Sequence, residues 1–145
     1  MPTDIIIVKQ QLNATIDVVW LALTSATQMK NWYFAMENFI AEPGFSFVMY
    51  GEKEGKYFPI NCSIIEVKKN SLLSYSWNYE GFPSTTLVSF ELLQNGPQTM
   101  LTLTHEGLKD IPKEATELYA ANHIAGWKNI IKKSLKDFVE KKSTG

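Results

Sequence analysis

The chain has 145 residues, of which 45% are hydrophobic and 20% charged, a balance typical of a globular protein rather than a disordered one. Its net charge of −1 argues against nucleic-acid binding, which needs a concentrated positive field, and no apolar run reaches the ~20 residues that span a bilayer. The length suits one domain with its own core, so we expect a single domain over residues 1–145.

Cys62 is the only cysteine, which excludes an intrachain disulfide and a multi-cysteine zinc site. It stands in a run typical of a strand, where we expect a buried, inert thiol, with a catalytic thiol as the alternative. The N-terminus lacks the basic segment and long apolar region of a signal peptide, so we expect a cytoplasmic protein without membrane insertion.

The N-terminal part of the chain predicts one strand followed by two short helices. The β-branched residues from Ile5 to Gln11 favour a strand. Apolar residues then recur at helical spacing from Val18 to Ser25, behind Thr15 or Asp17 as the cap, and a second short helix is predicted from Ala26 to Trp32.

The middle of the chain alternates apolar and polar residues and predicts five strands joined by turns. They are Phe45 to Tyr50, Lys56 to Val67, Leu73 to Tyr79, Thr86 to Leu92 and Thr99 to His105. Pro59 indicates an edge position or a bulge in the second of them. Consecutive strands with short connections predict an antiparallel meander with one face covered.

After residue 112 the apolar period becomes helical and continues to about Lys142. One stripe at three- and four-residue steps contains Ala120, Ile124, Trp127, Ile131, Leu135 and Phe138. The opposite face carries Lys128, Lys132, Lys136 and Glu140. We therefore predict an α+β fold in which a curved antiparallel sheet grips a long C-terminal helix.

The segment from Ala14 to Thr24 resembles the entry motif of activator of heat-shock protein 90 ATPase homologue 1-like domains. Further matches follow in the family's order, at Met29 to Trp32 with Phe34, Pro43 to Phe47, Glu66 through Leu73 to Trp77, Val88 to Leu92, Thr99 to Gly107 and Gly126-Trp127. Each motif alone is weak, but the ordered set spans nearly the whole chain. One departure is Pro43, which stands where a second glycine is common.

The resemblance implies a START-like, birch-pollen-allergen-like helix-grip fold of the SRPBCC superfamily, with a cavity between the sheet and the helix. It also implies binding of lipids or other hydrophobic ligands. Eukaryotic relatives stimulate a chaperone ATPase through an additional N-terminal domain, which we do not expect in a chain of this length.

Aromatic residues at strand and helix positions are the strongest functional indication. An ordinary filled interior accounts for most of them, but a largely apolar pocket with a few polar groups also suits a hydrophobic ligand. The candidate ligand-binding residues are Trp32, Phe47, Trp77, Tyr79, His105, His123 and Trp127.

The two histidines can be interpreted as functional or as structural residues. His105 would lie on the same face of its strand as Leu101 and Leu103. His123 precedes Trp127 by four residues, which places both on one face of a helix. Both can therefore point inward as polar anchors or proton-transfer groups, or serve as structural residues. We expect no metal site, because Glu106 would point away from His105 on a regular strand.

The chain contains no nucleophile elbow, phosphate loop or dinucleotide fingerprint, and we expect no cofactor. We therefore predict a carrier or sensor of a small hydrophobic molecule rather than an enzyme. Two alternatives stay open: an enzyme of the same fold, such as a cyclase, dehydratase or hydrolase acting on an aromatic or polyketide-like substrate, and a chaperone-related interaction module. The edge of the Pro59 strand could also pair with a second copy to form a homodimer.

Overall fold

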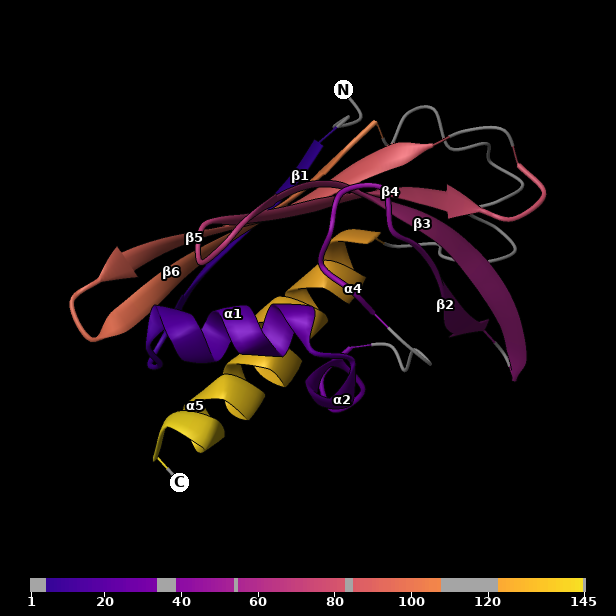
Figure 1. The fold of residues 1–145 in the computed structure, drawn as a ribbon. Coiled ribbons are helices and arrows are strands. Elements are labelled where there is room, and N and C mark those ends of the chain that lie inside the picture. Colours follow the sequence, from indigo (N-terminus) through magenta and orange to yellow (C-terminus); the bar gives the residue numbers. More distant parts are fainter. Residues whose placement is uncertain (1–4, 34–38, 54, 83–84, 108–122, 145) are drawn as a thin grey trace.

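The computed structural model describes residues 5–33, 39–53, 55–82, 85–107 and 123–144. The first strand precedes two short helices, and five strands then lead to a C-terminal helical rod (Figure 1). The elements are β1 (Ile5–Leu12), α1 (Ile16–Thr24), α2 (Ala26–Met29), β2 (Ser46–Lys53), β3 (Lys56–Lys68), β4 (Leu72–Tyr79), β5 (Thr86–Asn95), β6 (Gln98–Glu106), α4 (His123–Asn129), a π-helical segment (Ile130–Leu135) and α5 (Lys136–Thr144).

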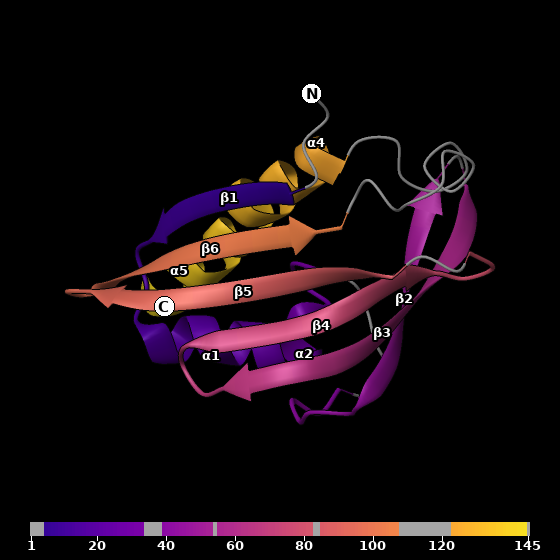
Figure 2. The ribbon, with the colours of Figure 1, turned by 90° about the horizontal axis from the view of Figure 1, so that it is seen from above.

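The six strands form one antiparallel sheet in the order β1-β6-β5-β4-β3-β2. The first strand pairs with the last, so that Ile6 lies opposite His105. All the labelled helices lie on one face of the curved sheet, and Figure 2 looks onto the other face, with the helices beneath it. This arrangement confirms the predicted α+β helix-grip fold. No helix in the described ranges combines the length and hydropathy needed to cross a membrane.

Strand alternation determines which side chains reach the interior. On β6, Leu101, Leu103 and His105 are buried while the residues between them are half-exposed. On β5, Val88 and Phe90 are buried in the same way. The inner face is therefore apolar, as expected for a sheet whose second face is covered by helices.

The C-terminal rod keeps one side against the sheet by widening its helical turn. Trp127, Ile131, Leu135 and Val139 are all buried and stand four residues apart. On a regular α-helix each four-residue step overshoots a full turn by about 40°. The π-helical segment has wider turns and offsets this drift. Val139 consequently occupies the buried position that the predicted stripe gave to Phe138, which is half-buried.

Pro59 lies in β3, which is paired on both sides, so the expectation that it marks an edge strand is wrong. The last residue pair between β3 and β4 is Ile60 with Tyr79, and the carbonyl of Pro59 accepts a hydrogen bond from the N–H of Glu80. The missing N–H of proline therefore falls just beyond the end of that ladder. The outer strands of the sheet are β1 and β2.

Gly51 of β2 lies opposite Phe58 of β3, and the ring covers the glycine backbone. A Cβ added to Gly51 would lie 2.3 Å from Cζ of Phe58, which is far inside van der Waals contact. The glycine is therefore required by the buried ring beside it rather than by a turn.

We expect Gly51→Ala to lower the free energy of unfolding by about 1–3 kcal/mol, because the ring of Phe58 must move out of its site. Gly126→Ala in α4 is the matched control, since its added Cβ meets no atom within 4 Å. That change should raise the free energy of unfolding by about 0.5–1 kcal/mol. Urea denaturation measures both, and a Gly51→Ala protein as stable as wild type would contradict the packing described.

Candidate functional site

The inner face of the sheet and the C-terminal rod share an interior cluster of ring side chains. Its members are Trp32, Tyr33, Phe47, Tyr75, Trp77, Tyr79, Phe90, His105 and Trp127. Six of the seven predicted ligand-binding residues belong to it. The side chain of the seventh, His123, lies outside the described part of the structure.

Four of the predicted residues are in direct contact. The ring of Trp77 lies 5.2 Å from that of His105 and 5.7 Å from that of Trp127, measured between centroids. Tyr79 meets Trp77 edge-on at 6.1 Å. The centre of the cluster is therefore formed by two strands and by the helix that covers them.

The other two predicted residues reach this centre through neighbours that were not predicted. Trp32 stacks on Tyr33, whose ring lies 6.1 Å from that of Trp127. Phe47 meets Tyr75 edge-on at 5.3 Å, and Tyr75 is followed by Phe90 and Trp127. All six are buried, so they form one continuous wall rather than separate sites.

His105 is fixed by hydrogen bonds on both ring nitrogens. The indole N–H of Trp127 donates to Nδ1 at 3.0 Å, and Nε2 lies 2.7 Å from the hydroxyl of Thr86. Because an indole N–H can only donate, Nδ1 carries no proton, and the neutral ring must hold its proton on Nε2. The hydroxyl of Thr86 accepts the hydrogen bond from Nε2–H and donates its own hydrogen bond to the backbone carbonyl of Trp77 at 3.2 Å.

The chain of hydrogen bonds from Trp127 through His105 and Thr86 to the carbonyl of Trp77, called the relay below, gives His105 a structural role. The ring is completely buried, and transfer of a proton would require one of its two hydrogen bonds to break. The arrangement suits a group that orients the helix against the sheet better than it suits a general acid or base.

Two tyrosine hydroxyls meet inside the cluster, with the Oη atoms of Tyr33 and Tyr75 2.6 Å apart. Burial raises the pKa of both phenols well above the ordinary value, and their mutual interaction raises that of Tyr33 further. Burial also raises the pKa of Tyr79 to about 12 and that of the Cys62 thiol strongly. Tyr33 is affected by all three of these neighbours, which places four neutral polar groups around one interior region.

The indole N–H of Trp77 is buried, and it has no hydrogen-bond partner among the residues that the structure describes. It lies near enough to the Tyr79 hydroxyl to oppose, in part, the effect of burial on the pKa of that group, but it makes no hydrogen bond there. Trp32 and Trp127 differ, because their N–H groups donate to the carbonyl of Ala22 at 2.9 Å and to His105. An unpaired buried donor costs about 1–3 kcal/mol.

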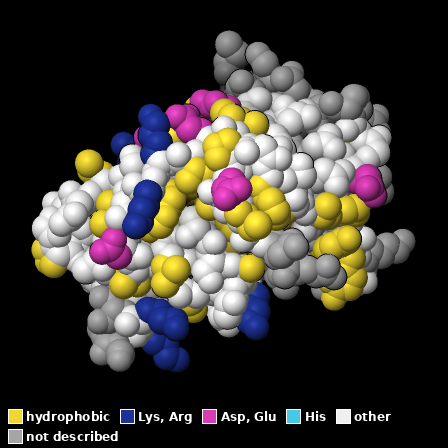
Figure 3. Space-filling model, viewed as in Figure 1, with side chains coloured by type: hydrophobic (Ala, Val, Ile, Leu, Met, Phe, Trp, Pro, Cys, Tyr) yellow, Lys and Arg dark blue, Asp and Glu magenta, His cyan; other side chains and the backbone are white. Residues whose placement is uncertain are grey.

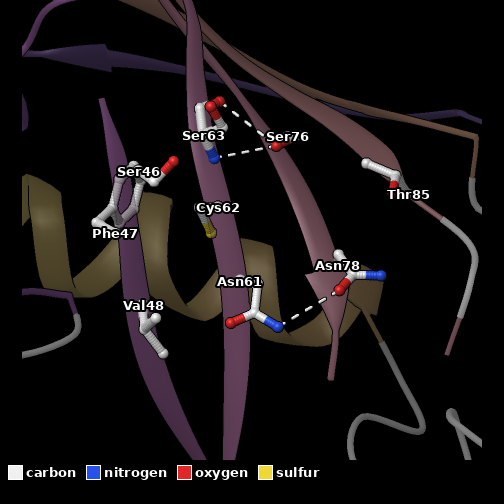
Figure 4. A pocket seen from close by; sticks show the side chains of 9 residues that line it. All are labelled: Ser46, Phe47, Val48, Asn61, Cys62, Ser63, Ser76, Asn78 and Thr85. Atoms are coloured by element: carbon white, nitrogen blue, oxygen red, sulfur yellow. Dashed lines mark hydrogen bonds between the residues drawn. The ribbon is translucent and has the colours of Figure 1, made fainter. Parts of the chain in front are cut away.

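The outer face of the sheet carries shallow hollows lined, apart from Phe47, by residues outside the ring cluster. One of about 390 Å³ lies over β2, β3 and β4 and is lined by Ser46, Phe47, Val48, Asn61, Cys62, Ser63, Ser76, Asn78 and Thr85 (Figure 4). Some of its polar side chains are hydrogen-bonded within the sheet: the backbone N–H of Ser63 donates to the Ser76 hydroxyl, and the side chain of Asn61 donates to that of Asn78. A second hollow of about 560 Å³ includes Lys9, Leu93 and Met100.

The described residues contain no group of three His, Cys, Asp or Glu side chains that could hold a metal ion. Charged side chains of both signs are interspersed on the face shown in Figure 3. The chemical features of the described interior are therefore neutral hydrogen-bonding groups among aromatic rings.

The sequence profile of the family described as activator of Hsp90 ATPase homolog 1-like protein matches residues 13–140. The chain belongs to this family. Its domain type, within the SRPBCC superfamily, is typically a ligand-binding fold. No functionally curated protein gives a significant match.

Solved structures share the fold at low sequence identity. DynU16, from the dynemicin biosynthetic locus, is 20% identical with a TM-score of 0.77, over 98% of this chain and 49% of that one. The chain thus spans about half the length of DynU16. MLL2253 from Mesorhizobium loti is 20% identical with a TM-score of 0.77, over 94% and 97% of the two chains. CalU16 from Micromonospora echinospora is 24% identical with a TM-score of 0.70, over 97% and 78%. These similarities show the fold alone.

Four residues of the site were not among the predicted ligand-binding residues: Tyr33, Tyr75, Thr86 and Phe90. Tyr75 lies on the same strand face as Trp77 and Tyr79, and Thr86 and Phe90 lie on the buried face of β5, so alternation could have found these three. Tyr33 lies just after α2, where no periodicity indicates its direction.

We expect Thr86→Val to lower the free energy of unfolding by about 1–3 kcal/mol, because Nε2–H of His105 loses its buried acceptor. Thr102→Val makes the same chemical change at a half-exposed residue of β6 and should stay within about 0.5 kcal/mol of wild type. Urea denaturation distinguishes the two, and equal losses would show that the hydroxyl of Thr86 does not support His105.

Tyr79 should make the protein sensitive to alkali. Its folded pKa of about 12 exceeds the ordinary value of 10.0, so the stabilisation is complete below pH 10 and is lost as pH rises toward 12. The shift corresponds to about 2–3 kcal/mol over that window. Tyr79→Phe should show a shallower fall in the free energy of unfolding between pH 10 and pH 12 than wild type, and parallel curves would refute the assignment.

Proposed function

We propose that the chain binds a small, mainly apolar molecule between the inner face of the sheet and the C-terminal rod, as a cytoplasmic carrier or sensor. The observation that carries this proposal is the gathering of neutral polar groups among the rings of the interior cluster. Burying hydroxyl and N–H groups costs free energy, and a core selected for stability alone is better filled with aliphatic side chains.

Such a wall has the composition of a ligand site. Small-molecule sites combine large apolar and aromatic area with a few placed hydrogen-bonding groups. The rings of Trp77 and Trp127 offer that area from opposite sides of the sheet–helix contact, and the tyrosine hydroxyls and the Trp77 N–H offer the polar groups. The family membership supports the same conclusion, because the domain is typically a ligand-binding fold.

The described residues support the two alternative functions, an enzyme and a protein-interaction module, less well than they support ligand binding. An enzyme that used His105 as acid or base would have to break the relay with Thr86 and Trp127. An interaction module would favour one contiguous apolar surface. The exposed large apolar side chains of the sheet are instead distributed over β1, β2, β3 and β5: Ile7, Val48, Tyr50, Tyr57, Ile65 and Leu93.

Native mass spectrometry of the protein purified from its host tests the proposal. We expect a retained small molecule in wild type and its loss in Trp77→Ala and Trp127→Ala, because each removes ring area from the wall. Leu93→Ala and Ile65→Ala on the outer face are the controls and should retain it. Circular dichroism and cooperative thermal unfolding establish that each variant is folded.

If the outer-face variants lost the molecule and the inner-face variants retained it, the site would lie on the outer face of the sheet, and the proposed location would be wrong. A wild-type protein that carries no molecule and binds no apolar probe would contradict the function itself.

A further inference from the structure

We infer that the ligand presents an uncharged hydrogen-bond acceptor, such as a carbonyl oxygen, and that the indole N–H of Trp77 donates to it. The inference rests on the proposed function, because it concerns the same site. It gives Trp77 the role of a hydrogen-bond donor to the ligand, in addition to the apolar contact that its ring provides.

The contrast among the tryptophans carries the first step. Trp32, Trp77 and Trp127 are all at least 94% buried, and the first and last have protein acceptors for their N–H groups. Within the described part of the chain the Trp77 N–H has no acceptor in hydrogen-bonding geometry, the nearby Tyr79 hydroxyl included, although nearly all buried donors in folded proteins are paired. A donor that is left unpaired beside other neutral polar groups is a position where a ligand atom can replace the missing acceptor.

The surroundings of Trp77 are rigid enough to aim that donor. Its ring lies against those of His105 and Trp127, which are hydrogen-bonded to each other. Its backbone carbonyl accepts a hydrogen bond from the hydroxyl of Thr86. These contacts hold the indole in place before a ligand arrives, so binding would not require the donor to be reoriented.

The charge of the acceptor follows from the same groups. The hydroxyls of Tyr33, Tyr75 and Tyr79 and the thiol of Cys62 are neutral, and the hydrogen bond from Trp127 requires a neutral His105. Among the described residues, the buried polar or charged side chains are Ser74, Thr86, Thr99 and His105, so none is a lysine or arginine. A carboxylate would enter without a counter-charge, whereas a carbonyl would gain the hydrogen bond at a much smaller desolvation cost.

Matched probes test the inference. Acetylnaphthalene and ethylnaphthalene have nearly the same shape, but only the first carries a carbonyl, and naphthoate adds a charge. By isothermal titration calorimetry we expect wild type to bind the ketone about tenfold more tightly than the hydrocarbon or the carboxylate.

Trp77→Phe should abolish this preference, since the donor is lost, while the smaller ring weakens the binding of ketone and hydrocarbon alike. Trp127→Phe is the matched control: it also removes an indole N–H, but one that is already donated to His105, so the preference for the ketone should remain. In the wild-type protein, the ketone should also shift the indole N–H proton resonance of Trp77 downfield and leave that of Trp127 in place.

Equal affinity for ketone and hydrocarbon, or a Trp77→Phe protein that keeps the preference, would overturn the inference while leaving apolar binding intact. Failure of all the probes to bind would instead contradict the proposed function. The resonance shift decides the matter in wild type even where a variant does not fold.

Discussion

The hydrogen bond from the indole of Trp127 to Nδ1 of His105 joins the C-terminal rod to the inner face of the sheet. It is a buried polar link between these two layers, and Thr86 extends it to β5 and to the backbone of β4. Because the indole can only donate, the bond also determines the tautomer of His105 and keeps the ring neutral. The π-helical segment that follows Trp127 lets the next three buried residues of the rod face the sheet while that bond is maintained.

The relay also explains why the polar groups of the interior divide into two kinds. His105, Thr86 and Trp127 satisfy one another, so they contribute order and a fixed helix position. The indole of Trp77 lies against the same rings, and its N–H finds no acceptor among the described residues. A folded protein retains such a cost where function requires it, and a ligand-binding fold provides that reason. The neutral state of the surrounding phenols then limits the chemistry of what can bind.

Much of this arrangement could be predicted from sequence periodicity. The alternation of Tyr75, Trp77 and Tyr79 predicts a shared inner face, and the parity of His105 with Leu103 predicts its burial. Other features depend on tertiary geometry. Val139 rather than Phe138 is buried because of a π-helical segment that residue types alone do not reveal. Pro59 is tolerated in an inner strand because the pairing of β3 with β4 ends one residue away, at Ile60. Whether an indole N–H finds an acceptor depends on atoms far apart in the sequence, so neither the satisfied donor of Trp127 nor the unsatisfied donor of Trp77 could be foreseen.

The central claim is that ligands bind on the helix side of the sheet and not in the hollows of its outer face. Intermolecular nuclear Overhauser effects between a bound apolar probe and assigned side chains measure this directly. The account predicts contacts from the probe to the ring protons of Trp77 and Trp127. Contacts confined to Val48 or Leu93, which line the outer hollows, would contradict it.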